Sequence, residues 1–204
     1  MTALFERSWH RAWSELAGDL DGCALRDELL TRYAEPQRKY HTRQHLEECL
    51  ALFEEVIALA PHPAEVEMAL WFHDAVYDVK GSGNEERSAD WAHRALIEAG
   101  VDAASADRVR QLVLVTKHDG VPSSPDEQVL VDIDLAILGA ERQRFDEYER
   151  QIREEYGFVP GFLFRRKRKQ ILKTFLDRPV LYSTPALRER LDARARENLR
   201  RAIG

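Results

Sequence analysis

Three histidines and several carboxylates fall within apolar helical patterns of this sequence. His41 and His45 stand four residues apart in "YHTRQH", and His73 and Asp74 form a pair in "LWFHDAV". Asp134 interrupts the apolar run "VLVDIDLAIL". A buried carboxylate is unfavourable unless a cation or hydrogen-bond donors meet it. One divalent metal satisfies two neutral imidazoles and two carboxylates together, so the pattern predicts a metal site.

The mixed nitrogen and oxygen set of His45, His73, Asp74 and Asp134 indicates which metals to expect. Such a set suits Mn, Fe, Co, Ni or Zn better than Ca. A second ion would need a bridging carboxylate, for which Asp74 is the first candidate, and Mg²⁺ is the candidate for that ion. Each residue taken alone is explained more simply as a hydrogen-bonded core residue or a helix cap. The coincidence of all four favours the metal.

The spacing of apolar residues around these candidates is helical along nearly the whole chain. The run 129–138 alternates like a strand, but its three- and four-residue spacing and Gly139 favour a helix. The sequence therefore predicts one all-α domain of about eight to ten helices over residues 1–204. This length fits a single domain. The metal-site core is expected at about 38–140, with the helices of 141–204 packing on it. Helices are expected over about 41–60, 66–77, 84–99, 103–117, 141–156, 162–177 and from 184 onward.

Helical geometry adds two expectations and one difficulty. On a helix His41 and His45 share a face, whereas Asp132 and Asp134 are turned about 200° apart, so only one of these aspartates can face a metal. Straight helices joined at the two prolines after residue 60 would leave His45 about 22 Å and His73 about 14 Å from the turn. A tilted crossing or a longer loop must make up the difference.

The order of these residues resembles the "H…HD…D" signature of the HD superfamily of metal-dependent phosphohydrolases. His45, the pair His73–Asp74 and a late aspartate match it in order. The stretch "YHTRQH" also resembles the "YHNxxH" element of cyclic-nucleotide phosphodiesterases, which are distant members of that superfamily. This resemblance implies an HD-type helical fold, in which His41 donates a proton to the leaving oxygen and His45 binds the metal.

A second resemblance concerns the late aspartate. "DIDL" resembles the "DxD" of HD nucleotide triphosphohydrolases, which implies that Asp134 is the ligand and leaves Asp132 as a helix cap or a contact behind the ligands. The segments "NEERSA", "IREEY" and "ARENL" resemble a bacterial family of predicted HD phosphohydrolases with no assigned substrate. The metal motif covers about half of the chain, from Tyr40 to Asp134.

Five further residues are candidates for binding substrate or supporting the ligands. Lys117 and His118 in "VTKHDG" and Arg153 in "QIREEY" could bind phosphate, since cationic donors match its oxygens. Asp78 and Glu86 could orient waters or a second metal. A solvated helix face or loop is the simpler interpretation for most of these charges, and His118 could equally interact with the C-terminus of its helix.

Composition restricts the class of protein. With 44% hydrophobic and 32% charged residues among 204, the chain is typical of a soluble globular protein. The net charge of −6 argues against a nucleic-acid partner, although "RRKRK" at 165–169 is locally basic. Cys23 and Cys49 have no metal or redox spacing; Cys49 is expected in the core, and a reducing, cytoplasmic setting is expected. No apolar run of about 18 residues predicts a membrane span.

The sequence therefore predicts an enzyme that hydrolyses a phosphate ester or phosphoanhydride of a small molecule by attack of metal-bound water. Nucleotides are among the candidate substrates. His41 would act as general acid, and Asp74 or Asp134 would orient the water. The alternative is a sensor or scaffold module that binds a metal or nucleotide without turnover. The expected partner is a small phosphate substrate, without nucleic acid or membrane, and both a monomer and a homodimer are open.

Overall fold

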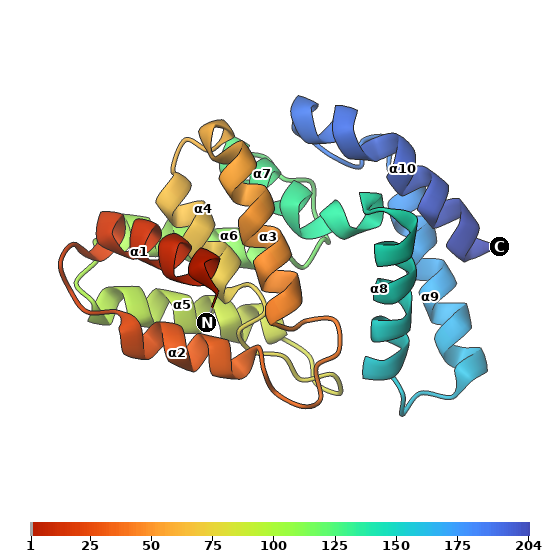
Figure 1. Cartoon of the computed structure of the whole chain (residues 1–204), viewed down its shortest axis with the longest axis horizontal. Helices are drawn as coiled ribbons and strands as arrows, with labels where there is room; N and C mark the ends of the chain where they lie inside the picture. Colours follow the sequence, from red (N-terminus) through yellow and green to blue (C-terminus); the bar gives the residue numbers. More distant parts are fainter. Residues whose placement is uncertain (1) are drawn as a thin grey trace.

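Helices joined by loops account for the fold of the computed structural model, which describes residues 2–204 (Figure 1). No strand occurs in these residues, so the predicted all-α class is confirmed. None of the described helices is both long and apolar enough to cross a membrane. The ten α-helices and two 3₁₀ helices of residues 2–204 are α1 (Ala3–Ala17), α2 (Cys23–Arg32), α3 (Arg43–Val56), η1 (Ile57–Leu59), α4 (Pro63–Phe72), α5 (Asn84–Glu98), α6 (Ala103–Val115), α7 (Pro125–Asp134), η2 (Leu135–Gly139), α8 (Arg142–Glu155), α9 (Gly161–Leu176) and α10 (Pro185–Ile203).

Helix α4 is the centre of the body formed by α1 to α7 (Figure 1). It packs against α1, α3, α6 and α7, and every residue from Ala64 to Phe72 is buried. Its sequence is apolar on nearly all sides, as expected for a helix enclosed by neighbours. The polar exceptions are Glu65 and Glu67, whose carboxylates pair with arginines of α6 and α1. The core therefore fixes the helix that leads directly to His73.

The C-terminal helices join this body through η2, on which α8 and α10 both pack. Asp132, near the end of α7, holds the start of α10. Its carboxylate accepts the N–H of Ser183 at 2.7 Å, the N–H of Thr184 at 2.6 Å and the Thr184 hydroxyl at 2.7 Å. These N–H groups belong to the residue before the N-cap and to the N-cap itself, so Asp132 anchors the segment that leads into α10 and is not a helix cap. Within residues 2–204 its carboxylate bonds only to this segment and not to the candidate metal ligands.

Asp132→Ala is expected to lower the free energy of unfolding by about 2–4 kcal/mol, because it leaves two backbone N–H groups and a hydroxyl without their buried acceptor. Urea unfolding measures the loss. Asp132→Asn keeps one acceptor oxygen and should lose less. If Asp132→Ala unfolds at the wild-type urea concentration, the anchoring role of this carboxylate is wrong.

The start of α3 differs from the prediction. The helix begins at Arg43, and Thr42 is its N-cap, with the hydroxyl accepting the N–H of Gln44 at 3.3 Å. Threonine is a preferred N-cap because its side chain satisfies an unpaired N–H of the first turn. His41 therefore lies in the turn before the helix. The prediction that His41 and His45 share a helix face is wrong.

The observed end of α3 and start of α4 explain how His45 and His73 lie at the same height along their two helices. α3 ends at Val56, before Pro61, and α4 begins at Pro63. At 1.5 Å per residue, His45 lies about 16 Å from the end of its helix and His73 about 15 Å from the start of its own. The 3₁₀ turn and loop between the helices make the connection, so the two histidines come level.

Helix α4 ends at Phe72, several residues sooner than predicted, and buried Arg38 holds the turn that follows. The Arg38 guanidinium donates to the carbonyl oxygens of Asp74 at 2.6 Å and Ala75 at 3.0 Å, and to that of His41 at 3.2 Å. One arginine thereby ties the turn that carries Asp74 to the turn that carries His41.

Candidate metal centre

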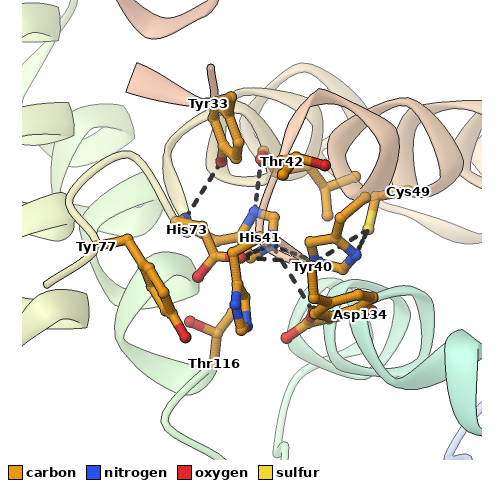
Figure 2. Close-up of polar contacts among 12 residues, drawn as sticks. Tyr33, Tyr40, His41, Thr42, Cys49, His73, Tyr77, Thr116 and Asp134 are labelled. Atoms are coloured by element: carbon orange, nitrogen blue, oxygen red, sulfur yellow. Dashed lines mark hydrogen bonds and ion pairs between the residues drawn. The ribbon is translucent and has the colours of Figure 1, made fainter. Parts of the chain in front are cut away.

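Four side chains from three helix ends converge beside the end of α4, and Figure 2 labels two of them, His73 and Asp134. The Nε2 atoms of His45 and His73 are 3.0 Å apart. Asp74 Oδ2 lies 3.1 Å from the Nε2 atom of His73 and 3.6 Å from that of His45. Asp134 Oδ1 lies 3.2 Å from the Nε2 atom of His45 and 3.8 Å from that of His73. The sequence predicted this convergence.

The separations fit a shared metal ion. Ligand atoms about 2.1 Å from an ion lie about 3.0 Å apart at right angles and about 3.4 Å apart at tetrahedral angles. The His73 Nδ1 atom faces the carbonyl oxygen of Leu70 at 2.7 Å, so Nδ1 carries the proton and Nε2 directs its lone pair to the centre. Such outer hydrogen bonds orient metal-binding histidines.

The electrostatics of the cluster show how strongly it attracts positive charge. Burial alone would lower the pKa of His73, but the carboxylates of Asp74 and Asp134 outweigh it and raise that pKa to about 9. Burial would raise the pKa of Asp74, yet His73 and His41 hold it well below its usual value. A metal must displace the proton from Nε2 of His73, so metal binding should release a proton and strengthen as the pH rises.

Cys49 belongs to the same cluster, because its Sγ atom and ligand atoms of His45, His73 and Asp134 all lie within 4.8 Å of one another. This group could hold a metal ion. The sulfur, however, is 3.7 Å from Nδ1 and 3.8 Å from Nε2 of His45. Nearly equal distances place it beside the ring, away from the Nε2 lone pair. The geometry therefore favours Asp74 over Cys49 as the fourth ligand.

His41 lies at the same site, and Glu155 of α8 holds it. The Nδ1 atom of His41 is 2.8 Å from Glu155 Oε2, and the ring stacks on Tyr77 with centroids 4.2 Å apart. The Tyr77 hydroxyl donates to the same carboxylate oxygen at 3.0 Å. Because Nδ1 faces a carboxylate it carries a proton, and Nε2 is the atom free to exchange a proton with a ligand.

The second oxygen of Glu155 fixes the turn around His41. Oε1 accepts the backbone N–H groups of Lys39 at 2.7 Å, Tyr40 at 2.8 Å and His41 at 3.0 Å. Burial would raise the pKa of Glu155, but His41 and these N–H donors lower it to about 2. Nothing in the spacing indicated this role, because Glu155 stands 114 residues after His41 on a highly charged helix.

Glu155→Gln is expected to lower the free energy of unfolding by about 2 kcal/mol at pH 7 in metal-stripped protein. The folded-state pKa of about 2 lies below the usual 4.5, so this stability is present above pH 4.5 and is lost as the pH falls towards 2. The difference from wild type in urea unfolding should therefore shrink between pH 7 and pH 3. A difference of the same size at both pH values would contradict the charge-based role.

A cavity of about 450 Å³ opens beside the cluster. His41, Asp74 and Asp134 line this cavity, so the candidate ligands and the histidine reach the same space. A volume of this size suits a small-molecule ligand. No pattern in the sequence indicated the lining residues contributed by the C-terminal part of α9 and the residue just after it, which are Ile171, Thr174, Phe175 and Arg178.

Lys117 and His118, both predicted to bind substrate, line the cavity. The Lys117 ammonium is paired with Glu86, with Nζ and Oε1 2.5 Å apart. Glu86 therefore neutralises the lysine and does not bond to the metal cluster. The His118 Nε2 atom lies 2.9 Å from Asp134 Oδ2, so His118 contacts a candidate ligand from the side opposite His45.

Arg153 and Asp78 lie away from the cluster. The Arg153 guanidinium donates to the carbonyl oxygens of Tyr156 at 2.9 Å and Val159 at 3.1 Å, where it satisfies acceptors after the end of α8. It does not line the cavity, so the predicted phosphate role is not supported. Asp78 is exposed and accepts the N–H of Lys80 at 2.9 Å, as a loop acid does.

Comparisons of the chain with protein-family models, with curated proteins and with solved structures find no match. The fold and the cluster therefore define the class of protein by themselves. The chain is an all-helical protein with a buried His/Cys/His/Asp group that could hold a metal ion, an arrangement compatible with an HD-like domain.

Proposed function

We propose that this protein is a metal-dependent phosphohydrolase that cleaves a phosphate ester or phosphoanhydride of a small molecule. One observation carries the proposal: a metal-capable cluster and a carboxylate-held histidine meet at one cavity. A phosphoryl-transfer site needs a Lewis acid, a positioned water and a proton donor for the leaving oxygen. The resemblance to the HD superfamily supports the same reaction.

His45, His73, Asp74 and Asp134 would hold the ion. When bound, the metal would supply a water of lowered pKa and would polarise a phosphoryl oxygen. Asp74 also lines the cavity, so its carboxylate can accept a hydrogen bond from the attacking water and orient it.

His41 would protonate the leaving oxygen from Nε2. Glu155 would keep the proton on Nδ1 and stabilise the imidazolium, because its Oε2 atom lies 2.8 Å from Nδ1. Tyr77 stacks on the same ring and bonds to the same carboxylate, which restricts the ring to one orientation. These three residues therefore place the transferable proton at one defined atom facing the cavity.

Metal add-back tests this proposal. Protein stripped by a chelator would be given Mn²⁺, Co²⁺ or Ni²⁺ and assayed on nitrophenyl phosphate, bis(nitrophenyl) phosphate and a nucleotide panel. Hydrolysis should return in proportion to the metal bound. Metal uptake without hydrolysis of any substrate would contradict the proposal and would favour a sensor module.

A further inference from the structure

The wall of the cavity opposite the metal cluster contains a cation without an ionic partner. Arg178 follows the end of α9 and is half-buried. Its guanidinium lies over the ring of Phe175, 4.8 Å from the centroid, and donates one hydrogen bond, to the carbonyl oxygen of His118 at 2.8 Å. A guanidinium has five N–H donors, so most of those of Arg178 are unused by residues 2–204.

The predicted phosphate-binding residues Lys117 and Arg153 already have other partners, and the basic run 165–169 is paired or exposed to solvent. Lys117 is paired with Glu86, and Arg153 is bonded to two carbonyl oxygens. In the run 165–169, Arg168 pairs with Glu149 and the other members are exposed. Arg178 instead has no carboxylate of residues 2–204 within ion-pair distance, and burial lowers its pKa without an acid to offset it.

His118 connects Arg178 to the metal cluster. Its carbonyl oxygen accepts from Arg178, while its Nε2 atom lies 2.9 Å from Asp134 Oδ2. The residue has a φ of 57°, a left-handed backbone conformation that is uncommon for a residue other than glycine. The backbone and side chain of one residue thus hold the guanidinium and a candidate metal ligand at the same cavity.

We propose that Arg178 binds a second anionic group of the substrate, next to the phosphoryl group held at the metal, so that the substrate class is a phosphoanhydride. This inference rests on the proposed function. A phosphomonoester has a single anionic group, which the metal neutralises, and would leave the half-buried guanidinium without a partner. A diphosphate presents two adjacent anionic groups, and arginine matches phosphate oxygens with paired hydrogen bonds.

The reaction on such a substrate is balanced without another reactant. The water oxygen forms a bond to the phosphorus at the metal, and the bond from that phosphorus to the bridging oxygen breaks. The bridging oxygen takes the proton from Nε2 of His41, and the proton released by the water restores His41. The leaving phosphate remains paired with Arg178 until it departs.

Calorimetric titration with two probes tests the inference. The probes are inorganic phosphate, with one anionic group, and methylenediphosphonate, whose P–C–P bridge cannot be hydrolysed. Both would be titrated into Mn²⁺-loaded protein, with metal content checked afterwards. Arg178→Gln should weaken methylenediphosphonate binding by about 10–100-fold, the usual value of charge-assisted hydrogen bonds, and phosphate binding by less than about threefold. Arg178→Lys should fall between, because it keeps the charge and loses the paired geometry.

Arg166→Gln is the matched control, because it removes the same charge from an exposed position of α9. It should bind both probes as the wild type does. Methylenediphosphonate binding that is unchanged in Arg178→Gln, or a loss equal to that of phosphate, would overturn the inference.

Nitrophenyl phosphate turnover by the same wild-type preparation separates this inference from the proposed function. A wild type that hydrolyses this ester, but binds methylenediphosphonate without needing Arg178, overturns the second-anion site alone. A wild type that needs Arg178 for binding, but hydrolyses no substrate, supports that site while contradicting the proposed function.

Discussion

Asp134→Ala is expected to empty the metal centre and reduce hydrolysis to background. Asp134 would supply one of two negative charges that offset the ion, and its carboxylate lies 3.2 Å from His45 Nε2 and 2.9 Å from His118 Nε2. Loss of such a ligand should weaken metal binding by more than about 10²-fold, since even residues that only orient ligands are worth 10–100-fold. Elemental analysis after gel filtration measures the effect. A chelator should lower the melting temperature of the wild type and leave that of the variant unchanged.

Two control variants sharpen this prediction. Asp132 lies two residues before Asp134, and its carboxylate bonds to the segment before α10. Asp132→Ala should therefore keep its metal despite its lower stability. Cys49→Ser should also keep its metal, because the sulfur lies beside the His45 ring. Loss of metal in Cys49→Ser, with retention in Asp74→Asn, would show that the sulfur is the ligand and that the assignment of Asp74 is wrong.

His41→Ala is expected to keep the metal and reduce turnover by about 10²–10⁴-fold, the usual value of a positioned general acid. Glu155 holds the ring at its Nδ1 atom, and the ring centroid lies 6.0 Å from that of His45, so we expect metal binding not to depend on His41. The loss of turnover should be smaller for nitrophenyl esters, because nitrophenolate is a good leaving group that barely needs protonation. Steady-state kinetics on nitrophenyl and alkyl esters of phosphate, with metal content measured in parallel, gives both results.

The pattern of losses identifies what His41 does. Equal losses for good and poor leaving groups would mean that His41 binds phosphate and does not donate a proton. Loss of metal in His41→Ala would make it a ligand, and the resemblance of "YHTRQH" to the phosphodiesterase element would then mislead. Glu155→Gln should reproduce part of the His41→Ala loss, because it removes the carboxylate that orients the ring.

Local sequence predicts most of this fold, because helix periodicity and capping residues act over a few residues. The start of α10 after Thr184 and the helical state of the apolar run in α7 follow from such signals. The C-terminal end of α4 and the turn before α3 do not. They depend on Arg38 and Glu155, whose hydrogen bonds join turns separated by 36 and 115 residues.

The same limit applies to the candidate site. The order and spacing of His45, His73, Asp74 and Asp134 predicted that these residues converge, because each lies on an apolar face that has to be buried. The cavity wall opposite them could not be predicted. Arg178 lies in the connection between α9 and α10, where no motif marks a site, and only the packing of these helices brings it to the cavity.

A crystal structure of the Mn²⁺-loaded protein, with anomalous scattering used to locate the ion, tests the central claim most directly. We expect one anomalous peak bonded to Nε2 of His45 and His73 and to carboxylate oxygens of Asp74 and Asp134, at about 2.0–2.2 Å. The ion should face the cavity that His41 lines. A peak bonded to other residues, or no peak in protein soaked with excess Mn²⁺, would contradict the account.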